Sequence, residues 1–183
     1  MQNNQALSAI FHRHSVRRFT GEKLSGEQIE TLLRAAMAAP TSMNVQPWQF
    51  VVITDEALVR KLSEVHPYAR MIGQAGTGIV VCGDTSLYER FNRLHGEDHT
   101  LYWVQDTSAA SENILLAAFA MGLGAVWTGV YPLQSRIAKL QELLNIPSHI
   151  IPLNIIVVGY PESEVGREKD KWDEQKIHYN TYK

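Results

Sequence analysis

The sequence NILLAAFAMGLGAVWTGVYPLQS, residues 113–135, contains no aspartate, glutamate, lysine, arginine or histidine. Its first nine residues are mostly good helix formers, and apolar side chains would lie on every side of the helix that they form. A helix without a polar face is covered on all sides by other parts of the protein. Gly122 and Gly124 would end this helix, because glycine readily takes the left-handed conformation found after a helix C-terminus. We therefore expect a buried central helix.

Residues 125–132 are rich in β-branched and aromatic side chains, which favours a strand that we expect to end at Thr128 and Gly129. Glycines and Pro132 interrupt the apolar segment, whereas a spanning helix needs unbroken hydrophobicity, so no contact with a membrane is expected. Small side chains would let a second helix approach closely at Ala109, Ala110, Ala117 and Ala118. A helix too apolar for one small chain to cover indicates an obligate homodimer.

The composition is typical of one globular domain over residues 1–183, with 45% hydrophobic and 20% charged residues. A net charge of −2 offers no basic field for nucleic acid. The single cysteine, Cys82, excludes an internal disulfide, and its apolar surroundings in the sequence predict a buried, unreactive thiol. No signal peptide is evident at the N-terminus, so we expect a cytoplasmic protein.

The remaining hydrophobic patterns interleave helices and strands. Helices are expected over residues 5–12, from Ser25 to Pro40, and over 55–65 and 133–144, and strands over 49–54, 77–82 and 150–158. Residues 84–102 are polar and aromatic, and we expect an irregular lid or pocket wall. The tail, residues 162–183, has too few apolar side chains to fold alone and is expected to pack on the partner subunit. We therefore expect an α+β fold, a three-layer α/β/α sandwich with a central mixed sheet.

Two motifs near the N-terminus carry polar groups that could bind a ligand. Arg13-x-Ser15-x-Arg17 would present two guanidinium groups and a hydroxyl on one side of an extended turn, which suits a phosphate. Ser42-x-Asn44-x-Gln46 would present a hydroxyl and two amides, suited to a heteroaromatic edge or a ribityl chain. The alternatives are a solvated basic turn for the first motif and ordinary turn chemistry for the second.

Two further motifs lie later in the chain. Gly129 at a strand end would let backbone N–H groups approach a flat ligand, although it could equally mark a bulge. Arg167, Lys169 and Lys171 place cations in the tail, where a solvated charge run is the alternative. His95 and His99 do not have the His-Glu-x-x-His spacing, so no metal site is expected.

In this order, the motifs resemble those of the nitroreductase family of flavin oxidoreductases over nearly the whole chain. RHSVRRF at residues 13–19 resembles the N-terminal Arg-x-Ser motif of the family, and APTSMNVQPW at 39–48 resembles its Pro-Ser-x-x-Asn-x-Gln-Pro-Trp loop. Residues 106–124 resemble its central dimer helix with the Gly-Leu-Gly that ends it. Residues 159–161 with the basic residues that follow resemble its C-terminal end.

The resemblance implies FMN bound at two sites in the interface of an obligate homodimer. Arg13 would bind the phosphate with Lys169 and Lys171, and Arg17 would face the flavin N1 and C2 carbonyl and stabilise the reduced flavin. The backbone of Thr128 and Gly129 would lie at the flavin N5. The loop at residues 39–48 would come from the other subunit. The implied cofactor-binding set is Arg13, His14, Ser15, Arg17, Pro40, Ser42, Met43, Asn44, Gln46, Trp127, Thr128, Gly129, Lys169 and Lys171.

The family activity implied is that of an oxidoreductase that transfers a hydride from NAD(P)H to flavin N5. Electrons then pass to a nitroaromatic, a quinone or a similar acceptor in a ping-pong mechanism that needs no catalytic side chain. Thr128 stands where many larger members have glutamate, which leaves the choice between NADH and NADPH open. Lys171 stands where arginine is usual, which loses the bidentate geometry but keeps the charge. The alternatives are another flavin reaction of the superfamily, an FMN-binding carrier or sensor without turnover, and a structural dimer without a cofactor.

Overall fold

The computed structural model describes residues 4–164 and 166–182. Four strands form one sheet in the order β1-β2-β4-β3, where β1 is Trp48–Ile53, β2 is Thr77–Asp84, β4 is Ile150–Gly159 and β3 is Gly124–Gly129. Every ladder between these strands is antiparallel. The expected mixed sheet is therefore wrong, because buried strands carry continuous apolar runs whatever their direction. Parallel pairing among the described residues is confined to one isolated bridge, between Ser15 and Ala125.

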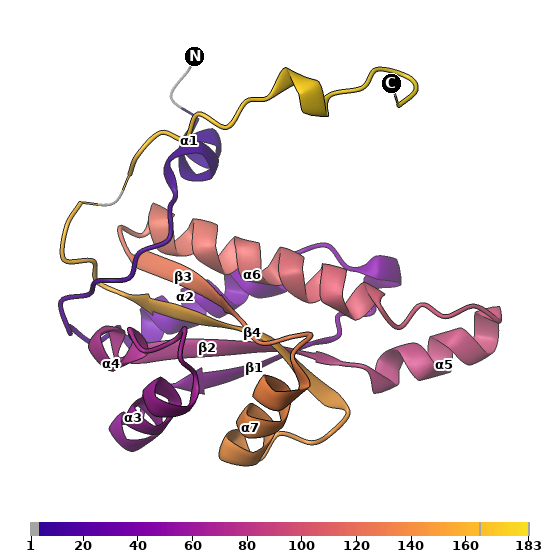
Figure 1. Ribbon diagram of the computed structural model, residues 1–183, viewed down its shortest axis with the longest axis horizontal. Coiled ribbons are helices and arrows are strands. Elements are labelled where there is room, and N and C mark those ends of the chain that lie inside the picture. The colour runs from indigo at the N-terminus through magenta and orange to yellow at the C-terminus, as the bar shows by residue number, and fades with distance from the viewer. Residues whose placement is uncertain (1–3, 165, 183) are drawn as a thin grey trace.

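Alternate residues of the strands face two separate hydrophobic clusters, so the sheet carries helices on both faces (Figure 1). Ile79, Val81 and Ile156 pack against α2 (Gly26–Met37) and α6 (Tyr102–Ala120). Val80, Cys82 and Ile155 pack against α3 (Glu56–Val65), α4 (Ile72–Ala75) and α7 (Gln134–Leu144). The fold is α+β, and the edge strands β1 and β3 lie at opposite sides of the sheet.

The central helix α6 is longer at its start than the apolar segment alone indicated. It begins at Tyr102, and Ala110, Ile114 and Ala118 are fully buried. Gly122 follows its end with a φ of +74°, which confirms the expected left-handed glycine after the helix. Strand β3 follows and ends at Gly129, as expected.

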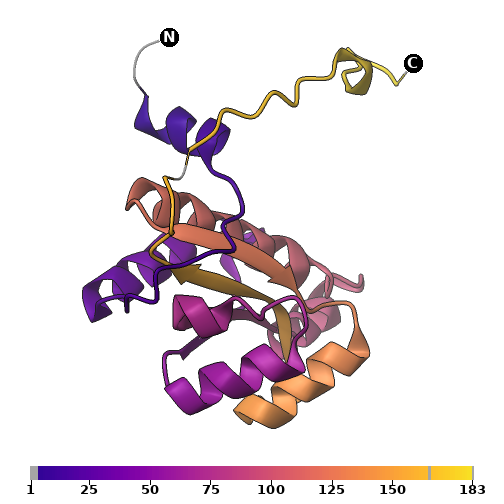
Figure 2. The ribbon, with the colours of Figure 1, turned by 60° about the vertical axis from the view of Figure 1, so that its left-hand side comes forward.

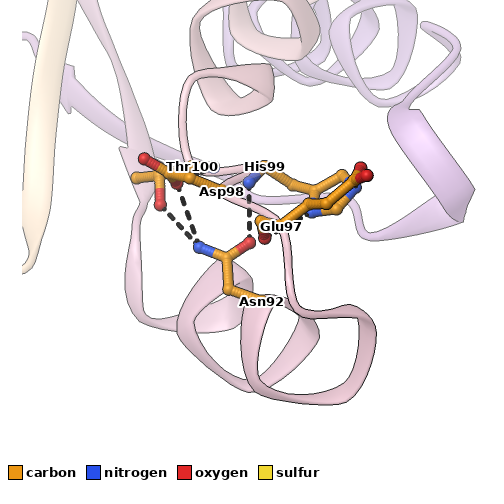
Figure 3. Close-up of polar contacts among 5 residues, drawn as sticks. All are labelled: Asn92, Glu97, Asp98, His99 and Thr100. Atoms are coloured by element: carbon orange, nitrogen blue, oxygen red, sulfur yellow. Dashed lines mark hydrogen bonds and ion pairs between the residues drawn. The ribbon is translucent and has the colours of Figure 1, made fainter.

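The prediction of an irregular segment over residues 84–102 is wrong, because Ser86–His95 form helix α5. The only buried residue of this helix is Tyr88. Apolar and aromatic side chains do recur at helical spacing, at Leu87, Tyr88, Phe91 and Leu94, but the prediction followed the polar composition of the segment. After α5, the side chain of Asn92 closes the loop that leads to α6 (Figure 3). Its Nδ2 donates to Thr100 Oγ1 at 2.9 Å, and its Oδ1 accepts from the backbone N–H of His99 at 2.7 Å.

Both ends of the described chain extend away from the sheet (Figure 2). Helix α1 (Gln5–His12) is followed by an extended segment that runs along β3. The tail returns beside α1, where the Lys169 N–H donates to the Phe11 carbonyl at 3.2 Å. It then leaves the body of the protein and contains the short 3-10 helix η2 (Glu174–Lys176). No described helix combines the length and the hydrophobicity that a membrane crossing requires.

Candidate functional site

The return of the tail brings cations from the two ends of the chain together. Arg13 is half-buried, and its Nε lies 3.4 Å from Glu112 Oε1. Burial lowers the pKa of Lys169, and the neighbouring charges of Arg13 and Lys171 lower it further, while Glu112 acts in the opposite direction. Arg13 and Lys169 therefore lie near the Glu112 carboxylate, and Lys171 adds a third positive charge near Lys169. This excess of positive charge favours an anionic ligand. We call Arg13, Lys169 and Lys171 the cation cluster.

The segment from Arg13 to Arg17 is fixed along the edge strand β3. The Val16 N–H donates to the Ala125 carbonyl at 3.0 Å, and the Val16 side chain is buried against Gly124. A Cβ on Gly124 would lie 2.7 Å from Val16 Cγ1, so only glycine permits this close approach. Ser15 and Arg17, on either side of the buried valine, are exposed.

The other end of β3, four residues beyond the bridge at Ala125, exposes its backbone. Thr128 is buried, and its Oγ1 donates to the Ile155 carbonyl at 2.9 Å. Gly129 is half-buried, and a Cβ there would meet no atom within 4 Å, so one side of its backbone is open. The Gly129 carbonyl accepts a hydrogen bond from Arg136 Nη1 at 2.9 Å. A flat ligand could therefore approach the strand end from the open side. Trp127, two residues earlier on the strand, is half-buried.

The loop that leads into β1 has an unusual backbone. Ser42–Asn44 form the 3-10 turn η1, and Met43, Asn44 and Gln46 have φ values of 49°, 56° and 52°. Residues other than glycine adopt this left-handed backbone conformation at a cost in energy. Gln46 Nε2 donates to Asn44 Oδ1 at 2.8 Å, and the side chains of Met43, Asn44 and Gln46 are exposed, as is Pro40. We call residues 40–46 the flavin loop, after the role that the resemblance implies.

Within one chain, the flavin loop and the cation cluster lie apart. The loop leads into β1 and the Arg13–Arg17 segment follows β3, and these edges are separated by three strand spacings, roughly 14 Å. The loop is bonded to Asp106 and the cluster to Glu112. Those two positions on α6 differ by about 9 Å along the axis and about 120° around it. One chain therefore assembles the predicted residues into two groups.

Sequence reasoning missed the residues that support the flavin loop and the end of β3. Asp106 is buried and accepts hydrogen bonds from the Ser42 N–H at 3.0 Å and from Tyr88 Oη at 2.5 Å. Arg136, which supports Gly129, also lies over the Tyr68 ring at 4.7 Å from its centroid. Two signals were available in the sequence. Asp106 is a carboxylate within an otherwise buried helix, and Arg136 is an arginine directly after an apolar segment.

Other features of the chain do not add to these groups. Cys82 is fully buried, and burial raises the pKa of its thiol to about 12, which confirms the expected unreactive cysteine. The His95 ring stacks on Phe91, and no group of three or more metal-binding side chains occurs within residues 4–164 and 166–182. A groove of about 520 Å³ lies elsewhere, beside Lys23 and Arg60.

Comparison with known proteins identifies relatives over almost the full length of the chain. The nitroreductase family model matches residues 10–66 and 63–160. A protein of Methanothermobacter thermautotrophicus, for which NADH dehydrogenase or NAD(P)H nitroreductase activity is proposed, is 42% identical over 94% of this chain and 85% of its own. A crystal structure from Parabacteroides distasonis, with the same proposed activity, is 43% identical with a TM-score of 0.88 over 98% of this chain and 100% of its own.

A third relative links this fold to specific ligands. The NADPH:FMN oxidoreductase of Vibrio harveyi, solved in complex with NAD+, has a TM-score of 0.81 and 27% identity over 98% of this chain and 79% of its own. Its likeness extends over the segments that carry the cation cluster and the flavin loop. The chain belongs to the nitroreductase family.

Proposed function

We propose that the protein is an FMN-dependent oxidoreductase that takes reducing equivalents from NAD(P)H and passes them to a nitroaromatic, a quinone or a similar acceptor in a ping-pong mechanism. Two observations together carry this proposal: the cation cluster, whose Arg13 belongs to the segment bridged to the start of β3, and the open backbone at the other end of the same strand. Family membership and the names of the relatives support the general activity, that of an NAD(P)H-dependent flavin oxidoreductase. When bound, FMN would supply the hydride-accepting ring.

The residues present fit the phosphate of such a cofactor. Among the charges that shift the pKa of Lys169, Glu112 is negative, and Arg13 and Lys171 are positive. A bound phosphate would therefore reduce the repulsion within the cation cluster. His14 Nδ1 is buried, and no described residue provides it with a hydrogen-bond partner. This nitrogen could donate to a phosphate or ribityl oxygen.

The protein's own groups would bind and orient the cofactor and would not react with it. Arg17 is exposed beside β3, where its permanent charge could stabilise an anionic ring. The backbone of Thr128 and Gly129 would define the approach to the ring edge, and Arg136 fixes the Gly129 carbonyl. Cys82 is too deeply buried, and its pKa too high, to act as a nucleophile.

We further propose a homodimer in which the flavin loop of one chain completes the site built on the other. This arrangement would unite two groups that a single chain keeps apart. The apolar side chains of Leu7, Ile10 and Phe11 on α1 are 43–48% exposed, and the tail exposes Trp172 at 72%. A second copy would cover this surface, with the tail packed on the partner.

The test is to purify the protein and to measure bound flavin and its reduction. We expect a yellow protein with FMN in each chain, bleached by NADH or NADPH without oxygen, and parallel double-reciprocal plots with a quinone acceptor. FMN uptake without turnover with any acceptor would instead identify a carrier or sensor. Failure to bind added FMN would refute the proposal, and reduction of other substrate classes only would point to another flavin reaction.

A further inference from the structure

Asp106 connects three elements of the fold through one buried carboxylate. The side chain belongs to α6 and is 5% exposed. Its Oδ1 accepts from the Ser42 N–H of the flavin loop at 3.0 Å, and its Oδ2 accepts from Tyr88 Oη of α5 at 2.5 Å. A buried carboxylate is costly unless its oxygens are paired, and both oxygens are paired here.

The flavin loop needs support from outside, because its own backbone is strained. Met43 and Asn44 are consecutive non-glycine residues in the left-handed region, and Gln46 is a third. Such conformations persist where the surrounding structure determines them, and they cluster at ligand sites. Inside the loop, the bonds are few, such as Gln46 N–H to Thr41 Oγ1 at 3.3 Å. The bond from Ser42 to Asp106 therefore fixes the first residue of the strained turn to the buried central helix.

Tyr88 in turn fixes the carboxylate. Its side chain is fully buried, and burial, followed by the hydrogen bond to Asp106, raises the pKa of the phenol, so it remains protonated and donates. With Oδ2 occupied in this way, Oδ1 is directed at the loop.

We propose that Asp106 is a positioning residue of the cofactor site, which sets the shape of the flavin loop through the Ser42 amide, with Tyr88 orienting the carboxylate. The inference rests on the proposed function, because the loop has a ligand to meet only if FMN binds. It assigns to α6 a role beyond packing, and it makes α5 part of the support of the site.

The test compares Asp106→Ala with Asp106→Asn and with the control Thr107→Val. Thr107 is the next residue on α6, is fully buried and donates only to backbone carbonyls of its own helix, so the control removes a buried hydrogen bond without touching the loop. We expect Asp106→Ala to weaken FMN binding by about tenfold to a hundredfold, the loss expected for a hydrogen bond to a charged group. Asparagine retains an acceptor for Ser42 and should stay within a few-fold of the wild type.

A second readout needs no flavin. In the apo-protein, hydrogen exchange of the peptide that covers residues 40–47 should accelerate in Asp106→Ala and stay at the wild-type rate in Thr107→Val and Asp106→Asn. If Asp106→Ala does not fold, Tyr88→Phe replaces it, with faster loop exchange and FMN binding weakened several-fold.

Two results would overturn the inference: equal weakening of FMN binding by Thr107→Val, and unchanged loop exchange in a folded Asp106→Ala or Tyr88→Phe protein. FMN binding by the wild type distinguishes a failure of this inference from a failure of the proposed function. A wild type that binds no FMN contradicts the proposed function, whereas a wild type and an Asp106→Ala variant that bind it equally contradict only the role of Asp106.

Discussion

The two groups of the candidate site are built on different physical principles. The cation cluster gathers positive charge on half-buried and exposed side chains, with Glu112 as its carboxylate partner. The flavin loop carries no charge, has a strained backbone and is fixed by the buried pair Asp106 and Tyr88. The cluster should therefore contribute most of the affinity for a phosphate-bearing ligand, and the loop should contribute shape. This difference predicts unequal responses to substitution and to salt.

Removal of the charges should have the largest effect. Arg13→Ala combined with Lys169→Ala removes two charge-assisted hydrogen bonds to a phosphate, each worth about 1.5–3 kcal/mol, so FMN affinity should fall more than about a hundredfold. Quenching of flavin fluorescence on binding measures this. The control is Arg18→Ala, an exposed arginine of the same basic segment, which should change affinity little. Equal losses in both variants would mean that general charge, and not the cluster, attracts the cofactor.

Substitution in the flavin loop should lower FMN affinity less, and this loss should be the same at low and high salt. Ser42→Ala combined with Asn44→Ala removes neutral groups worth about 0.5–1.5 kcal/mol each, so affinity should fall roughly tenfold. Because salt screens charges and not neutral hydrogen bonds, this variant should keep the salt dependence of the wild type. The Arg13 and Lys169 variant should lose most of it. FMN titrations of both double variants at low and high ionic strength test this. The same salt dependence in both variants would contradict the distinction between the cation cluster and the flavin loop.

Arg136 should have an intermediate effect on stability and a small one on binding. Arg136→Met deletes the hydrogen bond to the Gly129 carbonyl and the contact with the Tyr68 ring, which should lower the free energy of unfolding by about 1–2 kcal/mol. Denaturant unfolding of the apo-protein measures this. Arg136→Lys keeps the charge and should recover part of the loss. An unchanged midpoint in Arg136→Met would show that the strand end needs no such support.

The smallest effect concerns His66, which is 2% exposed and whose ring nitrogens have no hydrogen-bond partner among the described residues. Burial lowers its pKa, and the charge of Arg136 lowers it further. In the unfolded chain the histidine has a pKa of about 6.5, so below that pH the unfolded state binds a proton more readily than the folded state. The free energy of unfolding should therefore decrease as the pH falls below that value.

Thermal unfolding between neutral and mildly acidic pH tests this dependence. His66→Leu should flatten the loss of stability at acidic pH, whereas replacement of the exposed His149 by alanine should not. A steep acid dependence that survives in His66→Leu would assign the effect to other groups.

The sequence predicted features that depend on neighbouring residues. The glycine after α6 and the end of β3 at Gly129 are both local, and the structure confirms them. The direction of the strands was predicted wrongly, because it is decided by how distant segments meet. Helix α5 was missed although Leu87, Tyr88, Phe91 and Leu94 recur at helical spacing, because the prediction followed the polar and aromatic composition of the segment and not this period.

The site residues were predicted by type, but their supports were not. Arginine, lysine and amide side chains in short motifs indicated an anionic, aromatic ligand before any contact was known. The hydrogen bonds of Asp106 with Ser42 and Tyr88, and the proximity of the Lys169 and Arg13 charges, join residues far apart in the chain, and no local pattern encodes them. The assignment of the motif residues to a cofactor remains a prediction.

A mixed dimer tests most directly whether each site is shared between two chains. One chain carries Arg13→Ala with Lys169→Ala, the other Ser42→Ala with Asn44→Ala, and different affinity tags isolate the heterodimer. At an FMN concentration that leaves both parent homodimers empty, a shared site predicts that one site regains both intact groups, so the heterodimer binds FMN with wild-type affinity at half the wild-type stoichiometry. A heterodimer as empty as its parents would contradict the shared site.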